Sequence, residues 1–252
     1  MYGLDTVIHQ TTNRTAGSSA FAYYSAAQIR DSKTRPNILA GFQLAESGSV
    51  PFLSALSDRA AAEGDTWLAE KLAKHASDET RHGKIFAHAL QQLNKQVIDF
   101  KRQPQTTTTK KSQQRSPFFA AFFEGYTQEQ LKPAVIDWDV FMASTYILEL
   151  DASKDFARMA KVLPDYESTA RNLKLGMLCI AQDETGHATY LYEAMMRRMS
   201  ATEVQKLVDM WRTRKVNALL AMVGGILQRN GETRSLVQDS APSEIDSELV
   251  AT

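Results

Sequence analysis

The chain has 252 residues, with 29 basic and 29 acidic side chains and a formal net charge of zero. A neutral chain lacks the basic surplus typical of proteins that bind nucleic acids or acidic membrane surfaces, so neither is an expected partner. Cys179 is the one cysteine, which excludes an intrachain disulfide and a Cys-x-x-Cys site for iron.

The expected location is the cytoplasm. No N-terminal stretch joins basic residues to a long apolar run, as a signal peptide would. The most apolar C-terminal stretch, residues 218–227, is too short to cross a bilayer.

Helical periodicity dominates the chain, and no alternating strand pattern of useful length occurs, so the predicted class is all-α. Polar residues 1–20 are expected to be a flexible N-terminal segment before a helical domain over residues 21–229. A polar and basic linker, residues 101–117, is expected to be mobile, and residues 230–252 to be a disordered tail. The predicted helices are 21–30, 36–63, 66–96, 118–126, 133–160, 165–199 and 201–229.

A short word occurs twice on predicted helices, as DETRHG and as DETGHA. Each copy contains Glu-x-x-His, formed by Glu79 with His82 and by Glu184 with His187. Residues three apart on a helix lie about 60° apart around the axis and about 4.5 Å along it. A carboxylate and an imidazole in this relation can bind the same metal ion, so each copy predicts half of a metal site.

Each Glu-x-x-His helix follows an apolar helix that carries one further glutamate. Glu46 precedes Glu79 by 33 residues, and Glu149 precedes Glu184 by 35, which indicates two repeated helix pairs. Glu63, Asp139 and Asp151 are alternative ligands on these helices. Glu63 lies at a helix end and Asp139 is about three turns from Glu149, so the glutamates in the apolar runs are preferred.

Four buried glutamates need compensation, because unpaired carboxylates in a core cost several kcal/mol or shift their pKa values strongly. Two divalent cations would balance four glutamates while the two histidines stay neutral. Iron and manganese both accept carboxylate and imidazole ligands, and carboxylates can bridge two ions. The pattern therefore predicts a site for two metal ions.

Several neighbours of these ligands are candidates for supporting roles. Asp78 and Asp183 each precede a ligand glutamate, and we expect them to accept a hydrogen bond from a metal-bound histidine of the other helix pair. Tyr146 precedes Glu149 by three and is expected to lie beside the cluster. His75 precedes Glu79 by four, and either a supporting role or a role as an extra ligand is open.

The run from Asp78 to His82 resembles the Asp/Glu-Glu-x-Arg-His signature of the ferritin-like di-iron carboxylate superfamily. The second copy departs from it, because Gly186 stands where the signature has arginine. Over residues 36–199 the order of helices is most similar to small single-domain oxygenases such as aldehyde-deformylating oxygenases. The resemblance implies a ferritin-like four-helix bundle with additional flanking helices, and it assigns ligand roles to Glu46, Glu79, His82, Glu149, Glu184 and His187.

The function that these patterns predict is that of a non-haem di-iron oxygenase or oxidase. Its expected cofactor is two iron ions, with a manganese–iron pair as the alternative. Dioxygen and a small, apolar organic molecule are the expected substrates, the family likeness suggesting fatty aldehydes or acyl groups. A separate electron donor is expected because the chain has no second redox site, and a homodimer is compatible with the sequence.

Three other functions stay open on the sequence alone. A ferritin-like iron oxidase or peroxidase would use the same ligands, although the chain lacks a rubrerythrin-type Cys-x-x-Cys domain. An RNA-modifying hydroxylase of the same superfamily is disfavoured by the neutral charge. A metal-free helical interaction protein is disfavoured by the six-ligand pattern.

Overall fold

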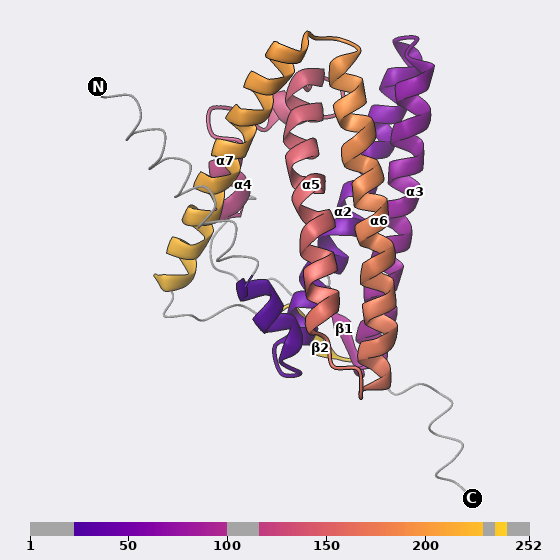
Figure 1. Ribbon diagram of the computed structural model, residues 1–252, viewed down its shortest axis with the longest axis vertical. Helices are drawn as coiled ribbons and strands as arrows, with labels where there is room; N and C mark the ends of the chain where they lie inside the picture. Colours follow the sequence, from indigo (N-terminus) through magenta and orange to yellow (C-terminus); the bar gives the residue numbers. More distant parts are fainter. Residues whose placement is uncertain (1–22, 100–115, 229–234, 241–252) are drawn as a thin grey trace, which may run out of the picture.

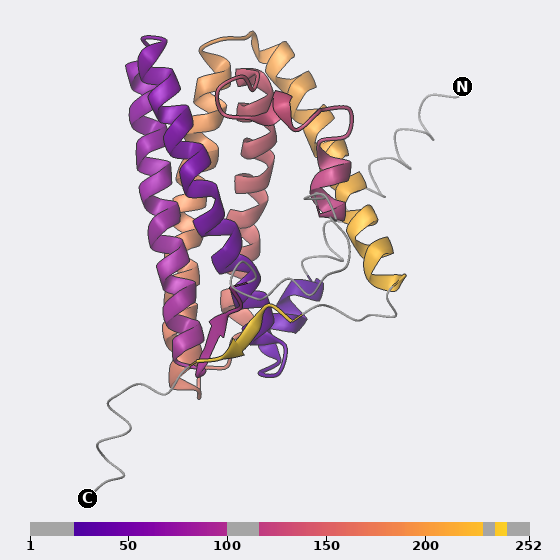
Figure 2. The ribbon, with the colours of Figure 1, turned by 180° about the vertical axis from the view of Figure 1, so that it is seen from behind.

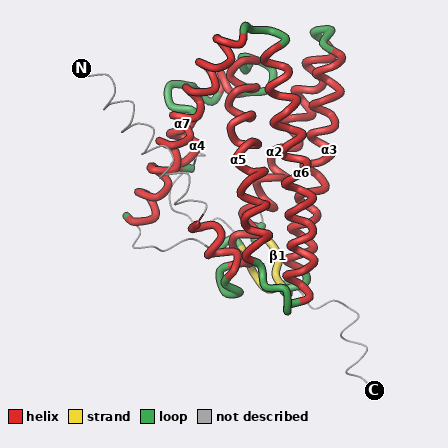
Figure 3. Tube along the Cα trace, viewed as in Figure 1, coloured by secondary structure: helices red, strands yellow, loops and turns green. Residues whose placement is uncertain are grey.

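The computed structural model describes residues 23–99, 116–228 and 235–240 (Figure 1). These parts are mostly helical, in agreement with the predicted all-α class (Figure 3). Residues 23–30 form a short first helix. The helices that follow are α2 (Arg35–Ala62), α3 (Thr66–Gln91), α4 (Pro117–Phe122), α5 (Trp138–Val162), α6 (Ser168–Met196) and α7 (Ala201–Leu227).

The long helices α2 and α3 form one antiparallel hairpin, and α5 and α6 form a second one beside it (Figures 1 and 2). Gly64 turns the first hairpin at a φ of 85°, a conformation that suits glycine. Asp65 then caps α3, since its carboxylate accepts a hydrogen bond from the Leu68 N–H. Asp137 caps α5 in the same way, so this helix begins at Trp138 rather than at Pro133.

The two hairpins meet differently on their two sides. The backbones of α3 and α6 approach each other closely, whereas those of α2 and α5 stay farther apart. Aromatic rings span the wider side. The rings of Phe42 and Phe156 have centroids 5.2 Å apart, and those of Phe52 and Phe141 are 6.1 Å apart.

The apolar core is divided into two clusters along the length of these helices. On α3, Ala76 belongs to one cluster and Phe86 to the other. On α6, Tyr190 belongs to the same cluster as Ala76, and Ala181 belongs to the same cluster as Phe86. The residues between these limits include every predicted metal ligand of α3 and α6, so a polar layer separates the two apolar clusters.

Helices α4 and α7 pack on each other and lie beside α5 (Figure 1). Ser200 and Glu203 form a reciprocal capping box at the start of α7. Fully buried Trp211 of α7 packs on Phe122 of α4, with ring centroids 5.1 Å apart. The aromatic helix expected at 118–126 is thus α4, which ends earlier than predicted.

The prediction of a disordered tail over residues 230–252 is wrong at one place. Strand β1 (Lys95–Val97) pairs antiparallel with β2 (Val237–Asp239), which falls inside the tail predicted for residues 230–252. Asn94, at a φ of 54°, marks the change from α3 to the strand. The pair is held because Leu236 and Val237 pack on an apolar cluster and the Leu236 N–H donates to the Asn37 side chain.

The predicted segment 1–20 lies outside the described residues. So do the linker 101–117, except for its last two positions, and the tail 230–252, except for residues 235–240. Within the parts that are described, no helix combines the length and the apolar character needed to cross a membrane.

Candidate metal centre

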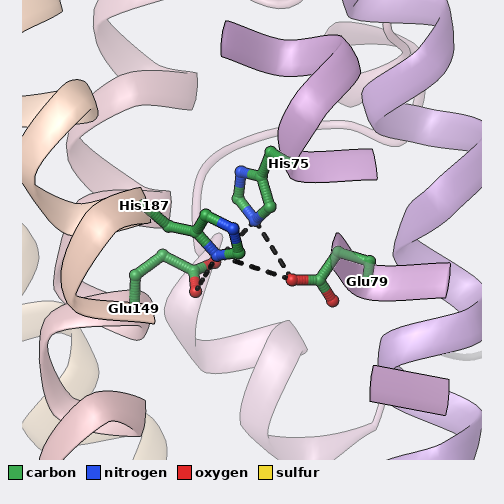
Figure 4. Close-up of side chains that lie close together, drawn as sticks. All are labelled: His75, Glu79, Glu149 and His187. Carbon is green, nitrogen blue, oxygen red and sulfur yellow. Dashed lines mark hydrogen bonds and ion pairs between the residues drawn. The ribbon is translucent and has the colours of Figure 1, made fainter. Parts of the chain in front are cut away.

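The six predicted ligands converge in the polar layer between the two apolar clusters. Glu46 comes from α2 and Glu149 from α5, while α3 and α6 each supply a glutamate and a histidine. The donor atoms form two groups, and within each group all of them lie within 4.8 Å of one another. One group is Glu46, Glu79, His82 and Glu184, and the other is His75, Glu79, Glu149 and His187 (Figure 4).

Glu79 belongs to both groups, so its carboxylate is placed to bridge two ions. Its Oε1 lies 3.7 Å from Nδ1 of His82 and also 3.7 Å from Nδ1 of His187. Its Oε2 accepts a hydrogen bond from the Ser49 hydroxyl at 3.1 Å. Glu184 lies between the same two imidazoles, 3.3 Å from His82 and 3.0 Å from His187.

Both predicted aspartates contact a histidine of the other hairpin. Nε2 of His82 lies 3.1 Å from Asp183, and Nε2 of His187 lies 3.2 Å from Asp78. These contacts leave Nδ1 of each imidazole facing the carboxylate cluster. A carboxylate that binds the outer nitrogen of a metal-ligating histidine fixes the ring orientation and its tautomer.

Arg81 joins the two outer aspartates across the interface between α3 and α6. Its Nη2 lies 2.9 Å from Asp78 and 2.7 Å from Asp183. Lys74 adds a second cation, 2.7 Å from Asp78. Burial alone raises the pKa of Asp78, but hydrogen bonds from Lys74, His187 and Arg81 outweigh it and lower the pKa to about 2. The two aspartates were predicted, whereas the link through Arg81 could not be read from the sequence pattern.

Tyr146 is not among the donor groups, and its predicted place beside the cluster stays a prediction. Its ring is half-buried and packs against Tyr192, with centroids 5.6 Å apart. Among the described residues, no hydrogen bond or ion pair connects Tyr146 to the donor groups.

His75 lies in the cluster, where the sequence left its role open. The side chain is 1% exposed, and its Nε2 is 3.2 Å from Glu79 and 3.7 Å from Glu149. Its ring stacks on that of His187 with centroids 3.7 Å apart. The spacing of four residues from Glu79 was the signal for this position, because residues four apart share one face of a helix.

The pKa values of the two Glu-x-x-His histidines are raised. Burial alone lowers the pKa of His82, but the nearby carboxylates of Glu184 and Glu46 outweigh it and raise the pKa to about 11. The same competition, with Glu149 and Glu184 as partners, raises the pKa of His187 to about 10. Burial lowers the pKa of His75, which favours a neutral imidazole there.

The four glutamates differ in the direction in which their pKa values are shifted. Burial raises the pKa values of Glu46 and Glu149 well above the usual range, and neighbouring glutamates add to the effect. Burial also raises the pKa values of Glu79 and Glu184, but hydrogen bonds outweigh it and lower both values. The hydrogen-bond partners include His75 in the case of Glu79. In the case of Glu184 they include Glu149 and His187. The cluster therefore stabilises a set of positive charges, which can be protons or cations.

The donor set fits metal ions. Among the described residues, Nδ1 of His82 is buried and has no hydrogen-bond partner. Burying an unpaired nitrogen costs free energy, and a bound ion or a hydrogen-bond donor would remove this cost. Each group offers four nitrogen and oxygen donors, a set suited to iron or manganese. The buried histidines and glutamates could thus hold metal ions, whose identity the geometry leaves open.

Comparison of the chain with protein-family models, curated proteins and solved structures finds no match. The geometry of the site is therefore the basis on which its function is argued.

Proposed function

We propose that the chain is a non-haem di-iron oxygenase or oxidase that activates dioxygen to oxidise an apolar organic substrate. The observation that carries this proposal is the pair of donor groups that share Glu79. Two adjacent ions held by carboxylates and imidazoles are the cofactor of such enzymes in helical bundles. The doubled Glu-x-x-His word in the sequence supports the same reading.

The proposal includes the ferritin-like four-helix bundle, formed by α2, α3, α5 and α6, with α4 and α7 as flanking helices. It is supported by the origin of the ligands, since α2 and α5 supply one glutamate each and α3 and α6 supply one Glu-x-x-His each. This distribution over the helices is the one that ferritin-like di-iron proteins use.

When bound, two iron ions, or a manganese and an iron, would supply the reduction of dioxygen, with electrons from a separate donor. The protein would hold the ligands in place and keep water away from the ions. Asp78 and Asp183 hold the outer nitrogens of His187 and His82, so that both Nδ1 atoms face the carboxylates. The two apolar clusters on either side of the polar layer would exclude water.

The side between α2 and α5 is the proposed entry for dioxygen and substrate. Glu46 and Glu149 have side chains 11% and 15% exposed, against 5% for Glu79 and 2% for Glu184. The more exposed ligands thus belong to the helices whose backbones stay farther apart. The phenylalanine rings that span this side would favour an apolar substrate over a charged one.

The test is oxygen uptake by the protein loaded anaerobically with ferrous iron, with a chemical reductant and a long-chain aldehyde present. We expect the aldehyde to increase oxygen uptake and an oxidised organic product to be found by mass spectrometry. Glu79→Ala should abolish both, whereas Glu70→Ala, an exposed glutamate on the same helix, should retain them. Uptake that yields only ferric mineral would instead identify an iron oxidase, and no uptake would contradict the proposal.

A further inference from the structure

We infer that His75 is a seventh ligand of the centre, held in place by Tyr190, and that it makes the two metal positions unequal. The position next to His75 and His187 would fill first and would bind its ion more tightly. The inference rests on the proposed function, because it assumes that the polar layer binds two ions.

His75 is oriented with one ring nitrogen toward the cluster and the other away from it. Nε2 points at the cluster, 3.2 Å from Glu79 and 3.7 Å from Glu149, as Figure 4 shows. Nδ1 points outward and lies 2.8 Å from the Tyr190 hydroxyl. With Nδ1–H donating to the tyrosine oxygen, the lone pair of Nε2 is directed at the carboxylates, where an ion would lie.

All three buried imidazoles of the cluster follow one pattern. Each has one nitrogen in the cluster and the other on an oxygen outside it, with Asp183 serving His82, Asp78 serving His187 and Tyr190 serving His75. Support of the outer nitrogen is what metal-ligating histidines require. A histidine placed only for packing would have no reason to repeat this arrangement.

The ring of His75 has little room to rotate. The rings of His75 and His187 stack with an angle of 25° between their planes and centroids 3.7 Å apart. Each ring therefore limits the rotation of the other. Tyr190 is buried and is itself held in an apolar cluster, so the support of His75 is rigid.

The consequence is a difference in donor chemistry between the two positions. One position has two imidazoles with Glu79 and Glu149, and the other has one imidazole with Glu46, Glu79 and Glu184. Imidazole donors suit Fe²⁺ and Co²⁺, while carboxylate oxygens suit Mn²⁺, and Mn²⁺ is the weakest binder of this series. The position with two histidines should therefore prefer iron or cobalt, and the carboxylate-rich position should discriminate less.

The test is a titration of the metal-free protein with Co²⁺, followed by the visible absorption of the bound ion and by calorimetry. We expect two binding steps, the first at least about tenfold tighter than the second. His75→Gln should weaken the first step by at least about tenfold and leave the second almost unchanged. His88→Gln, an exposed histidine on the same helix, should change neither step.

Tyr190→Phe keeps the ring in the core and removes only the support of Nδ1. It should retain two Co²⁺ ions per chain, weaken the first step by about 10- to 100-fold and change the visible spectrum of that step. Competition with Mn²⁺ should displace Co²⁺ from the second position before the first.

The outcomes separate the inference from the proposed function. If the unmodified chain binds two ions but His75→Gln or Tyr190→Phe changes neither step, or weakens both equally, His75 is no ligand and the inference fails alone. If the unmodified chain does not bind two ions, the proposed centre fails and the inference fails with it. Circular dichroism of each variant shows whether the helices are retained.

Discussion

The two sides of the polar layer differ in how firmly they hold their side chains. On the side of α3 and α6, Glu79 and Glu184 are almost completely buried, and the histidines are supported by Asp78 and Asp183. On the side of α2 and α5, each helix supplies one glutamate that is more exposed and lacks such a cationic or aspartate network. The backbones are also farther apart there.

This difference suggests a division of labour within one centre. The side of α3 and α6, the closed side, would fix the positions of the ions, because its ligands are oriented by hydrogen bonds that cross between the hairpins. The side of α2 and α5, the open side, would let ligands shift and let other molecules approach.

Glu79→Ala should remove most binding of both ions, because this carboxylate is shared by the two donor groups. Iron content measured after anaerobic loading should fall from about two ions per chain to well under one. Glu70→Ala on the same helix is the matched control and should keep about two. Retention of both ions in Glu79→Ala would mean that the closed side does not organise the centre.

Glu46→Ala should have a smaller effect, because Glu46 belongs to one donor group only. About one ion per chain should remain after loading, at the position next to His187. Asp58→Ala, an exposed acid on the same helix, serves as the control. Equal losses in Glu46→Ala and Glu79→Ala would remove the distinction between the two sides.

Asp183→Asn should lower the affinity for metal by about 10- to 100-fold without lowering the number of sites. The reason is that the amide can no longer hold the outer nitrogen of His82 as a carboxylate does. Competition with a chelator measures this change, and Glu193→Gln, an exposed acid on α6, should leave the affinity unaltered. An unchanged affinity in Asp183→Asn would show that support from α6 is dispensable.

Metal affinity should rise with pH. The pKa values of His82 and His187 are raised to about 11 and about 10, so both imidazoles carry protons near neutral pH. Their contribution to the stability of the metal-free fold is full below about pH 6.5 and is lost as the pH rises through 10 to 11. Each displaced proton should add about tenfold in affinity per pH unit.

The pH dependence is measured by repeating the titration with a metal ion between about pH 6.5 and 8.5. His75→Gln should keep the same slope, since burial lowers the pKa of His75 and this ring has no proton to release. An affinity independent of pH would show that the histidines of the closed side do not exchange protons for metal.

Ser49→Ala should give the smallest effect, a loss in metal affinity of about tenfold or less. Ser49 of α2 donates to Glu79 of α3 within the first hairpin, but its one proton is also placed to reach the backbone carbonyl of Glu46 at 2.6 Å. The same chelator competition measures the change. A loss as large as that of Asp183→Asn would mean that the open side is as firmly organised as the closed one.

The convergence of the ligands could be predicted because helical spacing is regular. Glu79 and His82 lie three apart, as do Glu184 and His187, so their side chains had to share a face in any helical fold. The contacts of Asp78 and Asp183 with the opposite hairpin followed from the same geometry. The ring orientation of His75 could not be read, because it depends on Tyr190 of another helix.

The errors have physical reasons as well. Strands β1 and β2 have three residues each, which is too short for an alternating pattern, and they pair across a long stretch of chain. The spacing of Tyr146 from Glu149 likewise did not predict its packing against Tyr192 of another helix. Local periodicity predicts which residues share a helix face, whereas contacts between distant segments need the tertiary structure.

The most direct test of the account is the number and magnetic coupling of iron ions in the oxidised, iron-loaded protein. A shared Glu79 predicts about two ferric ions per chain that are coupled through a bridge, so the pair should give almost no electron paramagnetic resonance signal. Mössbauer spectroscopy would confirm that iron is present. Isolated ferric signals that account for all of the iron, or a protein without iron, would contradict the centre proposed here.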